Sequence, residues 1–101
     1  MNNLREISKT SVLGNPIRFG IMLYLLPRER ALFIDIQRIL DITPGNLDSH
    51  LRKLKQEGYV EIKKVLADRP RTMVKITEKG AIETRNYLEK LKSVVSSYYE
   101  S

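Results

Sequence analysis

The sequence predicts a mainly helical α+β domain, in which short helices precede an antiparallel hairpin and a long C-terminal helix. Three stretches lead to this prediction: an amphipathic helix at 43–58, two alternating strands within 59–77 and a heptad-like helix over 81–101. The chain has 101 residues, which is enough for one domain with a single modest core.

Residues 43–58 carry the clearest helix signals in the chain. The hydroxyl of Thr43 can accept a backbone N–H at the helix start, and Pro44 suits the first helical position because its missing N–H would have no intrahelical partner there. Gly58 follows the last turn, where a residue in the left-handed region often ends a helix. The face expected to pack in the core holds leucines at i, i+4 and i+7: Leu47, Leu51 and Leu54.

The opposite face of this helix is small at its start, hydrogen-bonding in its middle and cationic toward its end. Its members are Gly45, Asn46, Ser49, Arg52, Lys53 and Gln56, with His50 at the flank. Such a surface suits a helix whose first half enters a DNA major groove while its basic residues meet phosphates. The alternative is a solvated polar face of the kind that exposed helices show.

Two helices are predicted near the N-terminus. The apolar spacing of Leu4 and Ile7, extended by Val12, indicates a short amphipathic helix. Asn15 and the proline after it form a cap-and-start signal for a second helix, which we expect Pro27 to end.

The next apolar run predicts a brief strand at 32–34 and a short helix at 35–40. We expect three positions of this helix to point into the core: Ile36, Ile39 and Leu40. Residues 41–43 then form a tight connection into the helix at 43–58. Two short helices joined by three or four residues match a helix-turn-helix.

The stretch after this motif predicts an antiparallel hairpin with a basic tip. The first strand alternates over 59–66, and a second follows at 72–77 in a register that leaves either Met73 or Val74 facing inward. On the inward side of the first strand we expect Val60, Ile62 and Leu66. The tip and its flanks are basic, through Lys63, Lys64, Arg69, Arg71 and Lys75.

Thr77 is expected to cap the last helix, whose apolar positions repeat as a heptad-like seam. The seam consists of Ala81, Thr84, Leu88, Leu91, Val95 and Tyr98. This apolar surface is wider than docking on a small domain requires, so we expect a dimerisation helix; the alternative is that it packs within one chain. The domain would then span 1–101, with a core at 13–80 and helices at 1–12 and 81–101 that contribute to a dimer interface.

Charge points to a polyanionic partner. The formal net charge is +6 and the pI is about 9.7, while residues 80–101 contain as many acidic as basic side chains. No apolar run approaches the roughly 20 residues of a membrane span, and the N-terminus lacks a secretory signal pattern. We therefore expect a cytoplasmic protein without a membrane partner.

Residue content argues against several kinds of chemistry. The absence of cysteine excludes disulfides and thiolate metal sites, and His50 is the only histidine. With no glycine-rich phosphate loop either, few residues are left from which to build a catalytic site, so we do not expect an enzyme. Neither a metal nor another cofactor is indicated.

A helix-turn-helix, a basic hairpin and a trailing helix make the layout of a winged helix-turn-helix with a two- or three-stranded antiparallel wing and a long C-terminal dimerisation helix. The sequence resembles the winged-helix DNA-binding regulators related to the MarR and ArsR groups. Three ordered blocks carry the resemblance: N-P-x-R-x-x-I-x-x-x-L at 15–25, G-N-L-x-S-H-L-x-K-L-x-x-x-G-Y-V at 45–60 and R-P-R-T-x-x-x-I-T-x-K-G at 69–80.

The resemblance implies a homodimer that binds duplex DNA, with the helix at 43–57 in the major groove and the wing on the adjacent backbone or minor groove. Carried over to this sequence, the base-facing candidates are Gly45, Asn46, Ser49 and Arg52. Phosphate contacts are expected from Thr43, His50 and Lys53, and wing contacts from Lys64, Arg69 and Arg71. The dimer interface would include Leu4, Ile7, Leu88, Leu91, Val95 and Tyr98.

Two basic residues have a structural alternative. His50 could hydrogen-bond within the fold instead of contacting DNA, and Arg18 could pair with a carboxylate such as Asp35 instead of reaching the DNA backbone. One departure from the ArsR group matters as well. Metal sensors of that group use cysteines or clustered histidine and carboxylate ligands, which this chain lacks, so metal sensing is not expected.

The function expected from these features is that of a sequence-specific transcriptional regulator, a homodimeric repressor that reads an inverted repeat in double-stranded DNA. Two alternatives stay open: a winged-helix module that docks another protein, and a low-specificity architectural DNA-binding protein. A small-molecule effector at the dimer seam, near Tyr24, Tyr87 or Tyr98, is also left open, although nothing in the sequence requires it.

Overall fold

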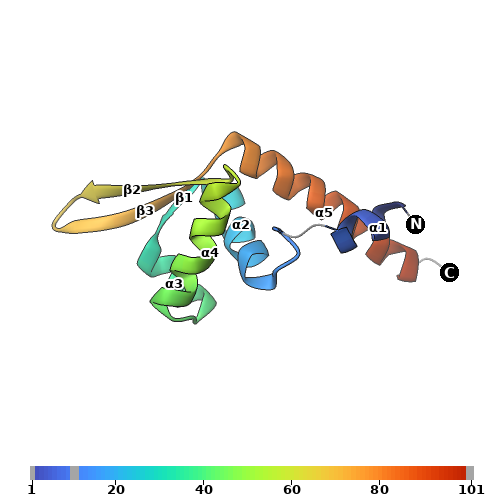
Figure 1. Ribbon diagram of the computed structural model, residues 1–101, viewed down its shortest axis with the longest axis horizontal. Helices are drawn as coiled ribbons and strands as arrows, with labels where there is room; N and C mark the ends of the chain where they lie inside the picture. The colour runs from blue at the N-terminus through green and yellow to red at the C-terminus, as the bar shows by residue number, and fades with distance from the viewer. Residues whose placement is uncertain (1, 10–11, 100–101) are drawn as a thin grey trace.

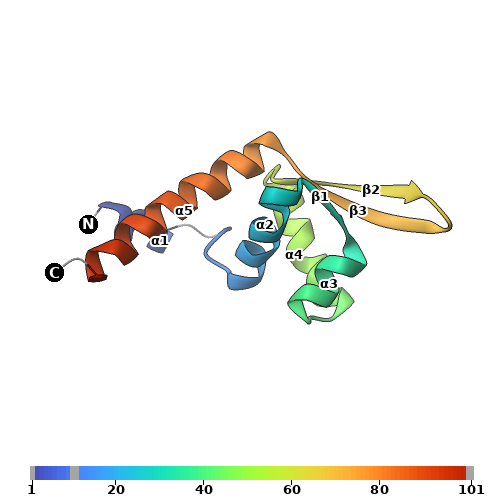
Figure 2. The ribbon, with the colours of Figure 1, turned by 180° about the vertical axis from the view of Figure 1, so that it is seen from behind.

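The computed structural model describes residues 2–9 and 12–99 and measures 55 × 24 × 22 Å along its principal axes (Figure 1). Its elements in chain order are α1 (Asn2–Lys9), α2 (Pro16–Arg28), β1 (Arg30–Leu32), α3 (Phe33–Leu40), α4 (Pro44–Gln56), β2 (Val60–Leu66), β3 (Pro70–Ile76) and α5 (Glu78–Tyr99). Figure 2 shows the same arrangement from behind: the β2–β3 hairpin projects at one end of the long axis, and α1 lies along the C-terminal part of α5 at the other. The predicted α+β architecture and long final helix are confirmed.

The strands form one antiparallel sheet in the order β1-β3-β2. β2 pairs with β3 along its whole length, beginning with Val60 opposite Ile76, and the two make the wing. β1 pairs with β3 only near the base of this hairpin, where Leu32 lies opposite Met73. The wing is therefore three-stranded at its base and two-stranded toward its tip.

The core lies where α2, α3 and α4 meet the sheet and the first half of α5. α4 contributes three leucines that are at most 1% exposed: Leu47, Leu51 and Leu54. They pack with Ile21, Met22 and Leu25 of α2, Ile36 of α3, and Val60, Val74 and Ile76 of the sheet. Val74 is fully buried, which decides the register that the alternation of β3 left open. Phe19 meets Tyr87 edge-on, with ring centroids 5.0 Å apart, and so joins α2 to α5.

Side-chain caps define where three helices begin, and all three are the predicted ones. Asn15 accepts two backbone N–H groups from the first turn of α2, at 2.9 and 3.0 Å, and Thr43 accepts one from α4 at 3.1 Å. Thr77 caps α5 by accepting the N–H of Gly80 at 2.9 Å. Its hydroxyl also donates to the carbonyl of Gly58 at 2.6 Å, which ties the start of α5 to the end of α4.

α5 starts in very close contact with the segment that follows α4. A Cβ on Gly80 would collide with the backbone carbonyl of Tyr59, so the approach requires glycine at this position. Gly58 has φ +77°, the left-handed conformation expected just past a helix end. These two glycines fix the angle at which the wing and α5 leave the core.

Several predicted boundaries are wrong, including the start of α3, at Phe33 instead of 35, and the start of β3, at Pro70 instead of 72. α2 does not end at Pro27 but includes it in its last turn, and the N–H of Glu29 still reaches the Leu25 carbonyl at 2.7 Å. A proline so near the end removes little from the helix, because few hydrogen bonds remain to be broken there. The brief strand lies at Arg30–Leu32 instead of 32–34, since its pairing with β3 begins at Arg30.

Three apolar side chains also lie elsewhere than predicted. Ile39 is 62% exposed, because α3 is short and only the side that meets α2 and the sheet is covered. Leu66 is 83% exposed, because it sits at the wing tip, beyond the reach of the core. Val12 is buried, but it lies after α1, which ends at Lys9.

Candidate nucleic-acid interface

The outward face of α4 forms an open hollow of about 460 Å³. It is lined by Gly45, Asp48, Ser49, Arg52, Lys53 and Gln56. Four of the predicted DNA-binding residues are thus brought together on the side of α4 opposite the three core leucines. Asp48 is an acidic member of this surface that sequence reasoning did not include.

The first turn of α4 presents small and polar groups to the exterior. Thr43, Gly45 and Asn46 are all exposed, and the hydroxyl of Thr43 is engaged as the helix cap. A Cβ built on Gly45 would meet nothing within 4 Å. Packing inside the protein therefore does not require glycine here, whereas a ligand that approaches the helix closely would.

Arg52 is held by Asp48 one helical turn before it. The Nε of Arg52 lies 2.9 Å from Oδ2 of Asp48, and the two side chains are 76% and 50% exposed. The distance is that of a charge-assisted hydrogen bond, in the i,i+4 arrangement that suits helical ion pairs. The guanidinium that sequence reasoning assigned to a base or a phosphate is therefore oriented by a neighbouring carboxylate.

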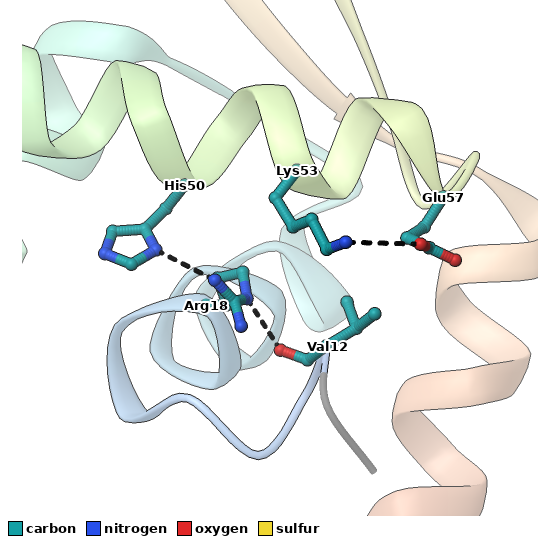
Figure 3. Close-up of polar contacts among 5 residues, drawn as sticks. All are labelled: Val12, Arg18, His50, Lys53 and Glu57. Carbon is teal, nitrogen blue, oxygen red and sulfur yellow. Dashed lines mark hydrogen bonds and ion pairs between the residues drawn. The ribbon is translucent and has the colours of Figure 1, made fainter.

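His50 contacts Arg18 of α2, as Figure 3 shows. Nη1 of Arg18 lies 3.4 Å from Nδ1 of His50, and Nε of Arg18 donates to the Val12 carbonyl at 2.8 Å. His50 therefore makes a contact within the fold through Nδ1. Arg18 likewise has partners within the fold, although Asp35, the carboxylate named as an example, lies 4.0 Å from Arg38.

The contact with Arg18 sets the protonation of His50. A guanidinium can only donate, so Nδ1 accepts and the proton of the neutral ring resides on Nε2. Partial burial lowers the pKa of His50, and the charge of Arg18 lowers it further. At neutral pH the ring is thus an uncharged donor through its second nitrogen.

Lys53 shares the flank of α4 with His50, and Figure 3 shows both side chains pointing toward the loop before α2. Its Nζ lies 3.8 Å from a carboxylate oxygen of Glu57, one turn later. Both side chains of this pair are about two-fifths exposed, at 43% and 39%. Such an exposed pair contributes little to stability, so Lys53 can exchange its partner at small cost.

The wing holds its basic residues with local partners. Lys64 donates to the hydroxyl of Thr72 across the hairpin at 2.8 Å. Arg71 pairs with Asp68 through contacts of 3.3 and 3.4 Å, and its side chain is only 27% exposed. The hydrogen bond and charge of Arg71 lower the pKa of Asp68. Arg69 lies exposed at the tip, where its carbonyl accepts the N–H of Ala67 at 3.3 Å.

The space between the wing and the helices is concave. One pocket of about 380 Å³ is lined by Leu32, Phe33, Ile34, Arg69, Pro70, Arg71 and Thr72. A second of about the same volume is lined by Phe33, Asp48, Leu51, Ile62, Lys64 and Thr72. The two share Phe33 and Thr72, so the concavity runs from the wing tip down to α4. Its basic residues lie on the wing side.

The predicted dimer residues lie at the other end of the molecule. Leu4, Val95 and Tyr98 are exposed, at 42%, 48% and 78%. Ile7 and Leu91 are partly buried against the core, and Leu88 is half-buried. Lys90 of α5 pairs with Glu6 of α1 at 3.1 Å and so joins the two helices. The heptad-like seam is therefore divided, since its first part packs within the chain and its last part faces outward.

Within residues 2–9 and 12–99, no group of three or more histidine, aspartate or glutamate side chains is placed to hold a metal ion. In the same part of the chain, no helix combines the length and the apolar character that crossing a bilayer requires.

Comparison with known proteins places this chain in a family. Residues 17–95 match the family described as winged helix DNA-binding domain. The structure of a transcriptional regulator homologue from Pyrococcus horikoshii OT3 has a TM-score of 0.93 and 53% identity, over 97% of this chain and 98% of that one. An uncharacterized protein of Methanocaldococcus jannaschii is 37% identical over 78 residues, which are 76% of this chain and 85% of that protein.

More distant proteins match as well. An uncharacterized HTH-type transcriptional regulator of Aeropyrum pernix is 32% identical over 84% of this chain, which spans 46% of that protein. The crystal structure of AbfR of Staphylococcus epidermidis has a TM-score of 0.71 at 22% identity, over 82% of this chain and 56% of that one. The chain therefore belongs to the winged helix DNA-binding domain family, among transcriptional regulators.

Proposed function

We propose that this protein is a homodimeric repressor that reads an inverted repeat in duplex DNA. α4 would lie in the major groove and the wing on the adjacent backbone or minor groove. The protein would act where chromosomal DNA is found, in the cytoplasm of a prokaryotic cell. Repression would follow from occupancy, since a bound dimer occludes the DNA that it covers.

One observation supports this proposal above the others. The polar face of α4 and the basic side chains of the wing line neighbouring hollows that share Asp48, Phe33 and Thr72, while the leucines of α4 are buried in the core. A convex phosphate backbone could pass through this concavity between helix and wing. The wing supplies Lys64, Arg69 and Arg71 and α4 supplies Arg52 and Lys53, and a protein-docking module would not need this set of cations.

The residues divide into two proposed roles. Asn46, Ser49 and Arg52 would contact base edges, and Gly45 would let the helix approach them closely. The cap residue Thr43 and the flank residues His50 and Lys53 would contact phosphates, as would Lys64, Arg69 and Arg71 of the wing. For His50 the proposed donor is Nε2, because Nδ1 accepts from Arg18.

We also propose that residues 1–101 form one winged-helix domain that dimerises through α1 and the C-terminal part of α5. Support comes from the exposed apolar side chains at that end, Leu4, Val95 and Tyr98, which a partner helix would cover. That end lies far from the wing along the 55 Å axis, so the proposed dimer interface and the proposed DNA-binding surface need not overlap. A two-fold dimer would then place its α4 helices in major grooves about 34 Å apart.

The test is selection of bound duplexes from a random DNA pool at about 150 mM salt, followed by affinity measurement on the selected and on unrelated DNA. An enriched inverted repeat bound at least about 10³-fold more tightly than unrelated DNA would support a dimeric regulator. Binding without enrichment would favour an architectural role, and no binding would favour a protein-docking module.

Substitution of the base-facing residues tests their assignment. Asn46→Ala or Arg52→Ala should relax the preference at one base position, at a cost of about 1–3 kcal/mol on the selected site. Each variant is compared with the wild type on a set of single-base variants of the selected site. Equal loss on every sequence would instead assign the residue to backbone positioning.

A further inference from the structure

We infer that Asp48 determines the sequence specificity of this interface in two ways. It holds Arg52 in the orientation that meets a base, and it neutralises the charge of Arg52, which would otherwise bind phosphates of any DNA sequence. The inference rests on the proposed DNA-binding function and adds a residue to it. Asp48 is acidic, whereas the side chains from which DNA contacts are predicted are mainly cations and amides, so the sequence pattern does not point to it.

The first step is the geometry of the pair. The carboxylate engages Nε of Arg52 at 2.9 Å, one turn along the helix. The guanidinium edge formed by the two Nη groups is then the one presented to a ligand. Two parallel N–H donors on one edge match O6 and N7 of guanine in the major groove. A free arginine would first have to lose rotamer freedom to reach this arrangement, whereas a held one has already lost part of it.

The second step is the position of Asp48 between the two surfaces of the interface. It lines the hollow on the outward face of α4 together with Arg52, Lys53 and Gln56. It also lines the pocket below the wing, together with Lys64 and Thr72. A DNA strand that passes from α4 to the wing would therefore run beside its carboxylate.

The third step is the effect of this carboxylate on unrelated DNA. Non-specific binding depends on the number of phosphates that cations neutralise. Because Asp48 and Arg52 form a neutral pair, Arg52 contributes little to that number while the pair is intact. On the specific DNA site, hydrogen bonds from Arg52 to a base compensate for the phosphate contact that Arg52 does not make. The pair would thus lower non-specific affinity more than specific affinity, which raises the ratio between them.

The experiment uses Asp48→Asn, which keeps the size and one acceptor oxygen but removes the charge. We expect affinity for unrelated DNA to rise severalfold, with a salt dependence steeper by about one log unit per log unit of salt, because Arg52 becomes free to bind a phosphate. The preference for the base that Arg52 contacts should relax, so that the ratio of specific to non-specific affinity falls by about tenfold. Asp48→Glu keeps a carboxylate at i,i+4 and should restore most of the ratio.

The matched control is Asp35→Asn. Asp35 pairs with Arg38 on α3 in a similar exposed setting, with side chains 46% and 76% exposed, so the charge change is the same. It should alter affinity for selected and unrelated DNA by the same factor and leave the base preferences unchanged. Unfolding curves of all variants are expected to match the wild type, because the pairs are exposed.

Two outcomes would overturn the inference. In the first, Asp48→Asn behaves as Asp35→Asn does: the affinities for selected and for unrelated DNA rise equally, and the base preferences are unchanged. Asp48 would then act only through its charge, and the proposed function would still stand. If the wild type itself fails to discriminate selected from unrelated DNA, the proposed function fails, and the inference fails with it.

Discussion

Gly45→Ala should make the protein more stable and its complex with DNA weaker. Gly45 lies in the first turn of α4, and an added Cβ would meet nothing within 4 Å. Alanine is favoured over glycine by about 1 kcal/mol inside a helix, and less near an end. We therefore expect the free energy of unfolding to rise by about 0.5 kcal/mol, which raises the melting temperature by about 2–4 °C.

The same methyl group should interfere with DNA. If the start of α4 approaches base edges as closely as proposed, the Cβ occupies space that the bases need. Forcing a methyl into a well-packed contact costs about 1–3 kcal/mol, which corresponds to a roughly 5- to 150-fold weaker complex. Circular dichroism in urea measures the stability, and fluorescence anisotropy of a labelled duplex measures the affinity for the selected site.

Gly80→Ala is the matched control, because the substitution is identical but the surroundings differ. At Gly80 the new Cβ collides with the Tyr59 carbonyl, so we expect a loss of about 1–3 kcal/mol of stability despite the better helix propensity. A stable Gly45→Ala protein that binds the selected site as tightly as the wild type would refute close approach of α4 to DNA. If Gly45→Ala instead destabilises the protein, the added Cβ does not lie in open space.

Three further predictions concern the wing, the dimer and pH. Arg69→Ala combined with Arg71→Ala should weaken binding to all sequences and reduce the slope of log affinity against log salt by up to about two; an unchanged slope would exclude phosphate contacts by the wing. Val95→Glu combined with Tyr98→Glu should give a folded monomer in analytical ultracentrifugation, because both side chains are exposed. Leu91 packs partly against the core, so its replacement would also damage the fold. A persisting dimer would place the interface elsewhere. His50 has a pKa below its usual value in the folded state, so its contribution to stability is present above the unfolded pKa of about 6.5 and is lost as the pH falls below it. Urea unfolding at about pH 7.5 and about pH 5 should therefore show a smaller loss for His50→Gln than for the wild type, and equal losses would contradict the assignment.

Local rules in the sequence were sufficient wherever the determining interaction lies within a few residues. The spacing of Leu47, Leu51 and Leu54 predicts one buried face because a helix turns by about 100° per residue. The caps at Thr43 and Thr77 follow because their hydroxyls accept N–H groups from the very next turn. Most of the polar face of α4 was accordingly predicted, although Asp48 was not among the predicted residues.

Where predictions went wrong, the deciding neighbour was distant in sequence. Leu66 continues the alternation of β2, yet the hairpin extends past the core and leaves it exposed. Ile39 matches the apolar spacing of α3, yet no other part of the described chain covers that side of the helix enough to bury it. A periodic pattern gives the relative direction of side chains, but not whether another element lies opposite them.

The fold class, the order of the elements and the outward face of α4 could all be predicted from the sequence, because helix periodicity, strand alternation and caps are local. Contacts between different elements follow from tertiary packing instead. Arg18 reaches His50 across 32 positions of the chain, and Asp48 belongs to both the α4 hollow and the pocket below the wing. Distances between side chains on different elements depend on how those elements pack, and packing is set by the whole core at once.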